Sequence, residues 1–380
     1  MTTFKGGSIK LGILGGGQLG RMLIQKAIDY NISTFVMDPD ENAPCKDLCT
    51  GFTHGNFRNF EEVMRFGANM DVITVEIEHV SVDALDELER MGKKVFPQPK
   101  ILRMVQDKGL QKEFYRLNKI PTAEFRLIER KDELHDYLDL LPVMQKMRKS
   151  GYDGKGVTAL RSKADFDKAF EEPSVLEKFV DFEKELAVIV SRNEFGVTSH
   201  YPVVDLEFNP EANLVEFLFS PATISKEIEH KAIETARSVI ESLKMVGILA
   251  VELFLTKNGE ILVNEIAPRP HNSGHQTIEG NVTSQYEQHL RAILGLPPGD
   301  TKITRPSVMV NLLGEKGFSG DAVYEGFNEV LQIPGTHIHL YGKKITKPFR
   351  KMGHVTVTAD TLQVAKENAL KVKELLKVKN

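Results

Sequence analysis

The chain has 380 residues, of which 41% are hydrophobic and 27% charged, and its formal net charge at pH 7 is −4. This length predicts two or three domains that each bury a core, and the composition is typical of an ordinary globular protein. The weakly acidic balance argues against a nucleic-acid partner, because proteins that bind nucleic acids carry a strong basic excess. Any anionic ligand must therefore be met by locally placed Lys and Arg side chains.

The cysteine content and the hydropathy pattern bear on the compartment. The two cysteines, Cys45 and Cys49, are too few for a zinc site and unlike a disulfide framework, which favours the cytoplasm. A membrane span needs about 18 consecutive apolar residues, and the chain has no such run. The N-terminus also lacks the hydrophobic core of a signal peptide. We therefore expect no membrane partner.

The N-terminal stretch matches a dinucleotide-binding pattern. We expect a buried strand at Ile9–Leu14, a glycine-rich turn at Gly15–Gly20 and a helix at Arg21–Asp29. A second strand, Ser33–Met37, ends at the acid Asp38. A strand, a G-x-G-x-x-G turn, a helix, a strand and an acid form the dinucleotide fingerprint. On these residues alone an NAD-dependent oxidoreductase is a fair hypothesis, although the fingerprint indicates the fold better than the ligand.

A third expected strand, Asp71–Val75, leads into the polar sequence Glu76-Ile77-Glu78-His79. A helix at Val82–Met91 and a strand at Val95–Phe96 complete a domain of βαβ type. Ligands bind at the carboxyl ends of parallel strands in such sheets, so Glu78 is the candidate for binding a sugar hydroxyl. The alternative is a polar strand end without a ligand.

The middle of the chain carries a glycine-rich loop. Helices are expected at Lys100–Gln106 and Leu110–Asn118, and a strand at Leu141–Lys146 precedes the loop Ser150–Val157. Its glycines would let the backbone fold closely over phosphates, with Lys155 at the tip. The G-K-[ST] ending of a Walker loop is absent. A glycine-rich hairpin without a ligand is the alternative.

A hairpin is expected where two apolar runs, Leu249–Leu255 and Ile261–Ile266, flank Asn258-Gly259, because Asn-Gly suits a turn with positive φ at both positions. A turn centred there pairs Phe254 with Val263, Leu253 with Asn264, and Glu252 with Glu265. Like charges directly opposite repel, which predicts a divalent cation at Glu252 and Glu265. Mg²⁺ is usually held by one or two carboxylates plus substrate phosphates. The alternative is a solvated edge hairpin.

The C-terminal part is expected to form a small third domain with strands at Met309–Leu313, His337–Tyr341 and Val355–Thr358. An amphipathic helix, Thr361–Leu376, closes the chain. The basic stretch Gly342–His354 suits an anionic ligand such as a ribonucleotide phosphate. A solvated basic loop is the alternative.

Four motifs in order carry a family resemblance that covers nearly the whole chain: GGGQLGRM, SGYDGKG, NEIAPRPHNSGH and RKMGH. With the strands between them, they resemble the ATP-grasp superfamily and, within it, the 5-(carboxyamino)imidazole ribonucleotide synthase family of purine biosynthesis. The resemblance implies an α/β ATP-grasp fold with a Rossmann-like (pre-ATP-grasp) domain over residues 1–100. The ATP-grasp domain, with two subdomains, would span 101–300, and the small C-terminal domain 301–380.

The resemblance also implies an ATP site between the two subdomains. Lys108 and Lys146 would approach phosphate, Glu185 would bind ribose hydroxyls, and Mg²⁺ would lie between Glu252 and Glu265. The backbone of residues 177–180 would read adenine. The expected cofactor contacts are Lys108, Lys146, Gly151, Tyr152, Asp153, Gly154, Lys155, Gly156, Val157, Glu177, Lys178, Phe179, Val180, Glu185, Asn264 and Glu265.

The implied reaction is that of an ATP-dependent ligase that forms a carbon–nitrogen bond. Bicarbonate attacks the γ-phosphorus to give carboxyphosphate, and the exocyclic amine of aminoimidazole ribonucleotide captures this intermediate or the CO₂ it releases. Carboxyphosphate hydrolyses easily, so a glycine-rich lid that excludes water has a physical purpose. The expected catalytic residues are Asp153, Tyr152, His271, Arg269 and Lys343. The expected substrate contacts are Gln18, Leu19, Glu78, Lys343, Arg350 and Lys351, which reassigns the glycine turn from a dinucleotide to a ribonucleotide.

The family also implies a homodimer. The chain departs from the family pattern at Phe208, Thr223 and Gln276, where a His, an Arg and an aromatic residue are common, and these changes affect single contacts. A formate-dependent glycinamide ribonucleotide formyltransferase of the same fold is the alternative enzyme. The NAD-dependent oxidoreductase and a catalytically silent nucleotide-binding regulator are alternatives from other classes.

Overall fold

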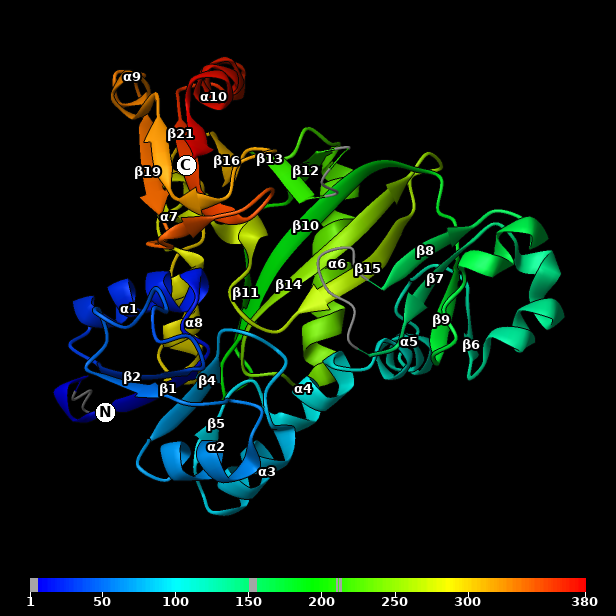
Figure 1. Cartoon of the computed structure of the whole chain (residues 1–380), viewed down its shortest axis with the longest axis horizontal. Helices are drawn as coiled ribbons and strands as arrows, with labels where there is room; N and C mark the ends of the chain where they lie inside the picture. Colours follow the sequence, from blue (N-terminus) through cyan, green and yellow to red (C-terminus); the bar gives the residue numbers. More distant parts are fainter. Residues whose placement is uncertain (1–5, 150–155, 210, 212–213) are drawn as a thin grey trace.

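The N-terminal part of the molecule is built around a sheet of five parallel strands (Figure 1). The structure is a computed structural model that describes residues 6–149, 156–209, 211 and 214–380. The strands are β3 (Gly51–His54), β2 (Ser33–Asp38), β1 (Lys10–Leu14), β4 (Val72–Val75) and β5 (Lys94–Val95), in that spatial order. The helices of this part are α1 (Gln18–Asp29), α2 (Phe60–Gly67) and α3 (Val82–Arg90). The sequence analysis predicted four of these five strands and the helices α1 and α3, and the structure confirms them. It missed β3 and α2, although Asn59 caps α2 by accepting the Glu62 N–H.

The next part is a small antiparallel sheet, which lies at the right of Figure 1. Its strands, in spatial order, are β6 (Phe125–Ile128), β9 (Ser174–Lys178), β7 (Val143–Met147) and β8 (Val157–Leu160). Two helices, α4 (Pro99–Val105) and α5 (Lys108–Leu117), lead into this sheet from the N-terminal part. The helix α5 contacts β9 of the small sheet, and α4 contacts α3 of the N-terminal part, so the two helices connect these parts.

The large sheet runs through the centre of the molecule (Figure 1). Its spatial order is β15 (Ile261–Ala267), β14 (Gly247–Thr256), β10 (Phe182–Arg192), β12 (Val204–Asn209), β13 (Leu214–Ser220), β16 (Ser307–Leu313), β21 (Lys351–Thr358) and β19 (Thr336–Leu340), with β11 (Thr198–His200) paired to β10. The long helix α6 (Lys226–Leu243) packs against β10, β14 and β15, and α10 (Leu362–Leu375) packs against β16 and β21. The three C-terminal strands expected from the sequence are therefore present, but they extend this sheet. Their assignment to a separate domain stays a prediction.

The β14–β15 hairpin has a different turn from the predicted one. Its loop is the three residues Lys257-Asn258-Gly259, and of these only Gly259 has a positive φ, at 77°. Phe254 therefore pairs with Leu262 and Leu253 with Val263, so these two predicted pairs are wrong by one residue. An irregularity between Glu252 and Leu253 then inserts one extra residue on β15, at Asn264. The insertion restores the predicted pairing of Glu252 with Glu265.

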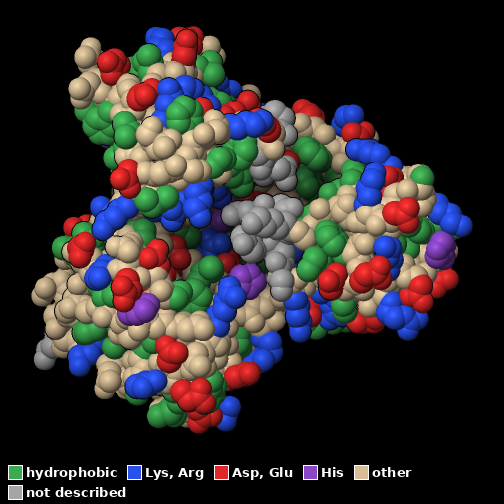
Figure 2. Space-filling model, in the orientation of Figure 1, with side chains coloured by type: hydrophobic (Ala, Val, Ile, Leu, Met, Phe, Trp, Pro, Cys, Tyr) green, Lys and Arg blue, Asp and Glu red, His purple; other side chains and the backbone are tan. Residues whose placement is uncertain are grey.

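One further helix joins the large sheet to the N-terminal part. The helix α8 (Gln285–Ile293) packs against α1 and so joins the large sheet to the N-terminal part. Among the helices that the structure describes, none is both long and apolar enough to cross a membrane. The three parts surround a hollow, and Figure 2 shows Lys and Arg side chains gathered in it.

We expect Gly259→Ala to lower the free energy of unfolding by roughly 1–2 kcal/mol, because a Cβ in the left-handed region crowds its own carbonyl oxygen. Packing plays no part, since that Cβ would meet only Ile228 Cδ1, at 3.8 Å. Gly259→Asn should lose less, because Asn tolerates this conformation. Urea unfolding of both variants measures the difference, and equal losses would contradict the backbone explanation.

Candidate functional site

Two carboxylates lie opposite each other near the edge of the large sheet. Glu252 of β14 pairs with Glu265 of β15, as expected from the sequence. Glu252 is largely buried, whereas the side chain of Glu265 is 55% exposed. Burial, followed by the charges of Glu265 and Glu185, raises the pKa of Glu252 to about 8. A cation held between the two carboxylates would offset this repulsion.

Two of the lysines expected to meet phosphate lie beside this acid pair. Lys108, the first residue of α5, places its Nζ 3.1 Å from the Glu265 carboxylate. Lys146 of β7 places its Nζ 3.0 Å from Glu177 and 3.4 Å from the side-chain oxygen of Asn264. The structure therefore brings together five predicted site residues from α5, β7, β9 and β15: Lys108, Lys146, Glu177, Asn264 and Glu265.

The sequence analysis missed a third lysine at this place. Lys112 lies one helical turn after Lys108 on α5, and its Nζ is 3.3 Å from the Glu177 carboxylate. Residues four apart share one face of a helix, so the spacing from Lys108 was the available signal. The signal was weak because exposed lysines at this spacing are common on helix surfaces.

The segment expected to read a base follows β9. The side chain of Glu177 is buried between the two lysines, so it is not available to a ligand. The N–H groups of Lys178 and Phe179 donate to the carbonyl oxygens of Glu124 and Pro142. A base at this place would therefore be read by other backbone groups of residues 177–180. On β10, burial raises the pKa of Glu185 to about 7, although the positive charge of Lys146 lowers it.

Most of the glycine-rich loop lies outside the described residues, including Gly151, Tyr152, Asp153, Gly154 and Lys155. Its last two residues are described. Gly156 has a φ of 74° and its carbonyl accepts the Met147 N–H, and Val157 begins β8 opposite Lys146. The loop is therefore attached directly to the strand that carries Lys146.

The loop after β15 places two further candidates near Glu252. The Nε of Arg269 is 2.8 Å from the Glu78 carboxylate, so Glu78 already has a cationic partner. The Nε2 of His271 is 3.7 Å from Glu252, and its Nδ1 is 2.9 Å from Ser273 Oγ. Burial, followed by the charges of Arg269 and Lys351, lowers the pKa of His271 well below its usual value. His271 is therefore a neutral imidazole at neutral pH.

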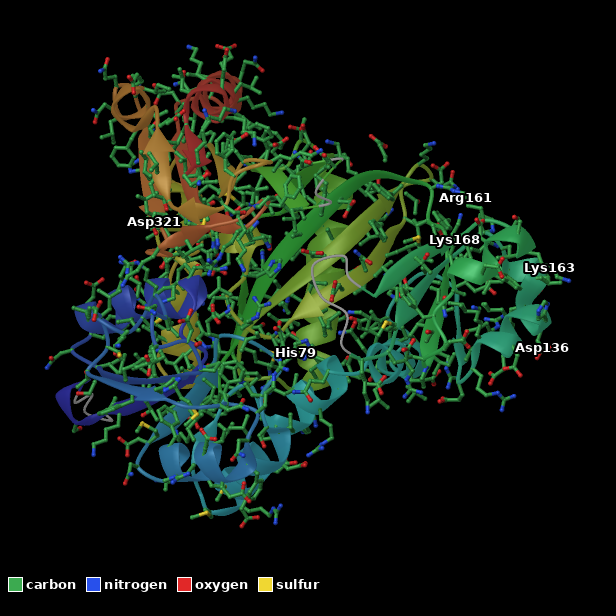
Figure 3. All side chains as sticks on the ribbon, in the orientation of Figure 1. His79, Asp136, Arg161, Lys163, Lys168 and Asp321 are labelled. Carbon is green, nitrogen blue, oxygen red and sulfur yellow. The ribbon has the colours of Figure 1, made fainter. Side chains whose placement is uncertain are left out.

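The glycine turn of the N-terminal part also faces this centre. Gln18 and Leu19 begin α1, and the Leu19 N–H donates to Glu76 at the end of β4. The Gly16 N–H donates to Asp38, at 2.7 Å. His79, labelled in Figure 3, lies near the middle of the molecule, whereas the labelled Asp136, Arg161, Lys163 and Lys168 lie at the right, in segments outside the strands of the small sheet.

The basic C-terminal stretch approaches the same place. The Nζ of Lys343 donates to the carbonyl of Lys351, and Arg350 donates to the carbonyl of Ile345. The charge of Lys343 acts on Glu76, and the charge of Lys351 acts on Glu252. The three parts therefore converge on one centre, as the sequence predicted, while the ligand roles of these residues stay predictions.

Three families match successive parts of the chain. Residues 8–106 match the ribonucleotide synthetase preATP-grasp domain, residues 113–286 the ATP-grasp domain, and residues 307–368 the phosphoribosylaminoimidazole carboxylase C-terminal domain. The ATP-grasp fold and the order of its parts, which the motifs predicted, are therefore confirmed.

Individual relatives agree. The chain is 41% identical over 372 residues to the chloroplastic phosphoribosylaminoimidazole carboxylase of Vigna aconitifolia, with 95% of this chain and 66% of that protein covered. The chain thus spans about two thirds of the length of this relative. The crystal structure of N5-carboxyaminoimidazole ribonucleotide synthetase from Thermotoga maritima matches with a TM-score of 0.91 and 43% identity, covering 98% of this chain and 99% of that one.

A further solved structure was obtained with ligands. It is N5-carboxyaminoimidazole synthase from Aspergillus clavatus in complex with ADP and 5-aminoimidazole ribonucleotide. It matches with a TM-score of 0.88 and 36% identity, and the match covers 97% of this chain and 99% of that one. Similarity of this extent over whole chains shows common descent as well as a common fold. This chain belongs to the N5-carboxyaminoimidazole ribonucleotide synthase family of ATP-grasp proteins.

Proposed function

We propose that this chain is an ATP-dependent ligase of purine biosynthesis. It carboxylates 5-aminoimidazole ribonucleotide with bicarbonate to give N5-carboxyaminoimidazole ribonucleotide, ADP and phosphate. The observation that carries the proposal is the opposed pair Glu252 and Glu265, with Lys108 and Lys146 beside it, in a chain of this family. Opposed acids next to clustered lysines suit a metal–triphosphate complex.

Glu252 and Glu265 would hold Mg²⁺. Among the residues that the structure describes, no three His, Cys, Asp or Glu side chains form a metal site. Two carboxylates completed by phosphate oxygens and water are the usual Mg²⁺ environment, so this donor set fits the ion. When bound, the cation neutralises charge on the β- and γ-phosphates during transfer.

The nucleotide would lie between the small and large sheets. Lys108 and Lys146 would contact its phosphates, Glu185 its ribose and residues 177–180 its base. Glu185 has a raised pKa because it is buried, and a ribose hydroxyl is a neutral partner that suits such a group. The glycine-rich loop that follows Lys146 would cover the phosphates and exclude water from them.

The carboxyl transfer would take place beside the acid pair. An oxygen of bicarbonate attacks the γ-phosphorus and ADP leaves. The exocyclic amine then attacks the carboxyl carbon, either in carboxyphosphate or as released CO₂; phosphate is lost and the amine gives up a proton. Arg269 would orient the bicarbonate with its planar guanidinium. His271, as a neutral imidazole, would accept the proton, together with Asp153, while Tyr152 positions the imidazole of the substrate.

The ribonucleotide would lie between the N-terminal part and the C-terminal basic stretch. Gln18, Leu19 and Glu78 would contact it from one side, and Lys343, Arg350 and Lys351 from the other. The glycine turn favours this assignment over a dinucleotide. Protein carboxylates of Asp38 and Glu76 already accept N–H groups of the turn, which an NAD pyrophosphate would otherwise use.

The proposal includes a cytoplasmic homodimer and the division of the chain at residues 100 and 300.

The opposed acids by themselves do not separate this enzyme from a formyltransferase of the same fold, because both activate an acid with ATP. The C-terminal match over residues 307–368 favours the carboxylating enzyme.

The substrate pair is tested by ADP release in a coupled assay. We expect sustained ADP release with ATP, Mg²⁺ and bicarbonate only when 5-aminoimidazole ribonucleotide is added, because the amine is needed to capture the activated carboxyl group. A second mixture contains ATP, Mg²⁺, formate and glycinamide ribonucleotide. Sustained release in that mixture alone would assign the formyltransferase activity, and binding of NADH in a fluorescence titration would revive the oxidoreductase.

Glu265→Gln should lower kcat roughly 100-fold or more, because an amide is a poor ligand for Mg²⁺. The melting temperature should change little, since this side chain is more than half exposed. Glu260→Gln, at an exposed position in the same hairpin, is the matched control and should keep wild-type turnover. A loss of melting temperature that parallels the loss of turnover would make Glu265 a structural residue.

The buried carboxyl of Glu76 predicts a pH dependence of stability. Burial raises its pKa to about 7 from the ordinary 4.5, although Arg269 and the Leu19 N–H oppose the shift. The folded state thus retains a proton that the unfolded state releases, so the free energy of unfolding falls as pH rises from 4.5 to 7. Glu76→Gln should flatten part of this slope in urea unfolding across that range. An unchanged slope would show that Glu76 has the same pKa in the folded and unfolded states.

A further inference from the structure

A buried group of three charges lies behind the acid pair. The carboxylate of Glu177 on β9 uses one oxygen for each of two lysines, with Lys112 at 3.3 Å and Lys146 at 3.0 Å. The side chain of Lys112 is only 2% exposed and that of Glu177 6%. Buried charges persist only when they are paired and hydrogen-bonded, so this group requires an explanation.

Lys112 makes a hydrogen bond in addition to its ion pair. Its Nζ donates to Thr122 Oγ1 at 2.6 Å, and the Thr122 hydroxyl donates to the Val263 carbonyl at 2.8 Å. Val263 also donates its N–H to Pro121. Lys112 is therefore tied to β15 two residues before Glu265.

The same network holds Lys146. Its Nζ lies between Glu177 and the side-chain oxygen of Asn264, the extra residue that the β15 irregularity inserts. Elements α5, β7, β9 and β15 thus meet at one carboxylate. The side chain of Lys146 is 17% exposed, whereas that of Lys112 is buried, so Lys146 is the lysine that a ligand can reach.

The charges of the group do not cancel. Burial pushes the pKa of Glu177 up, but Lys146 and Lys112 push it further down, so the carboxylate stays ionised. Burial lowers the pKa of Lys112 to about 8 against the charge of Glu177, so Lys112 remains mostly an ammonium at pH 7. Two ammonium groups and one carboxylate then leave one net positive charge. If Lys112 were neutral, Glu177 would be balanced by Lys146 alone and nothing would remain for an anion.

We propose that Lys112 is a positioning residue for the nucleotide phosphates: it neutralises Glu177, so that the charge of Lys146 remains available to the ligand. The inference rests on the proposed function, in which Lys146 meets phosphate. Lys112 itself touches no ligand. Its role is to allow one carboxylate to hold Lys146 in place without consuming its charge.

The test is the affinity for Mg²⁺-ADP, measured by titration calorimetry on the full chain. Lys112→Met should weaken binding about tenfold or more, because the net charge of the group falls to zero. Adding Glu177→Gln to that variant restores the net positive charge and should recover most of the affinity. Glu177→Gln alone should weaken binding less than Lys112→Met, because it removes the carboxylate that holds Lys146 but leaves Lys146 its charge. Lys226→Met, at a lysine whose side chain is 96% exposed, is the control and should bind normally.

Two outcomes would overturn the inference. A double variant that binds no better than Lys112→Met would show that Lys112 acts through packing, because charge balance would then have no effect. If Lys112→Met does not fold, the double variant is compared with Glu177→Gln: the two should bind alike, and weaker binding by the double variant overturns the proposal. Absence of nucleotide binding by the wild type would instead defeat the proposed function and this inference with it. Affinity for 5-aminoimidazole ribonucleotide should be the same in all variants that fold.

Discussion

The repulsion between Glu252 and Glu265 is the constraint on which the rest of the site depends. Side chains directly opposite on neighbouring strands lie about 5 Å apart at Cβ, and two carboxylates there oppose each other's ionisation. The raised pKa of Glu252 reflects this competition together with burial. Cationic side chains offset this repulsion. Lys108 pairs with Glu265, and the charges of Arg269 and Lys351 lower the pKa of Glu252. This combination of opposed acids and neighbouring cations suits the metal and the phosphates of the proposed function.

The second requirement is that three parts of the chain meet at this pair. Arg269 joins the loop after β15 to Glu78 in the N-terminal part, and Lys344 donates to Asn42 across the same boundary. Three imidazoles stack on one another, with His354 between His275 and His339, and join this loop to β21 and β19. The rings of His275 and His354 are buried, whereas that of His339 is partly exposed. Ring stacking and ion pairs therefore hold the parts together at this junction.

The glycine turn shows how one local pattern serves different ligands. A strand, a glycine turn and a helix are built here as in a dinucleotide-binding domain, and the five-stranded parallel sheet follows. In this chain Asp38 and Glu76 accept N–H groups of the turn. Which ligand such a turn can accept therefore depends on side chains at the ends of neighbouring strands, of which the fingerprint includes Asp38 but not Glu76.

The sequence by itself determined most elements that form from short-range signals: four of the five strands and two of the three helices of the N-terminal part, and the two hairpin strands. Alternation and glycine turns are local signals, which is why these elements could be predicted. The order of four motifs determined the family. Only the tertiary structure decided the hairpin register, in which a three-residue loop shifts the pairs by one and an extra residue at Asn264 brings Glu252 and Glu265 back together. It alone also decided the partners of Lys112, Glu177 and Arg269, because these charges come from distant segments. Their pairing depends on how the sheets pack, and no spacing along the chain encodes that.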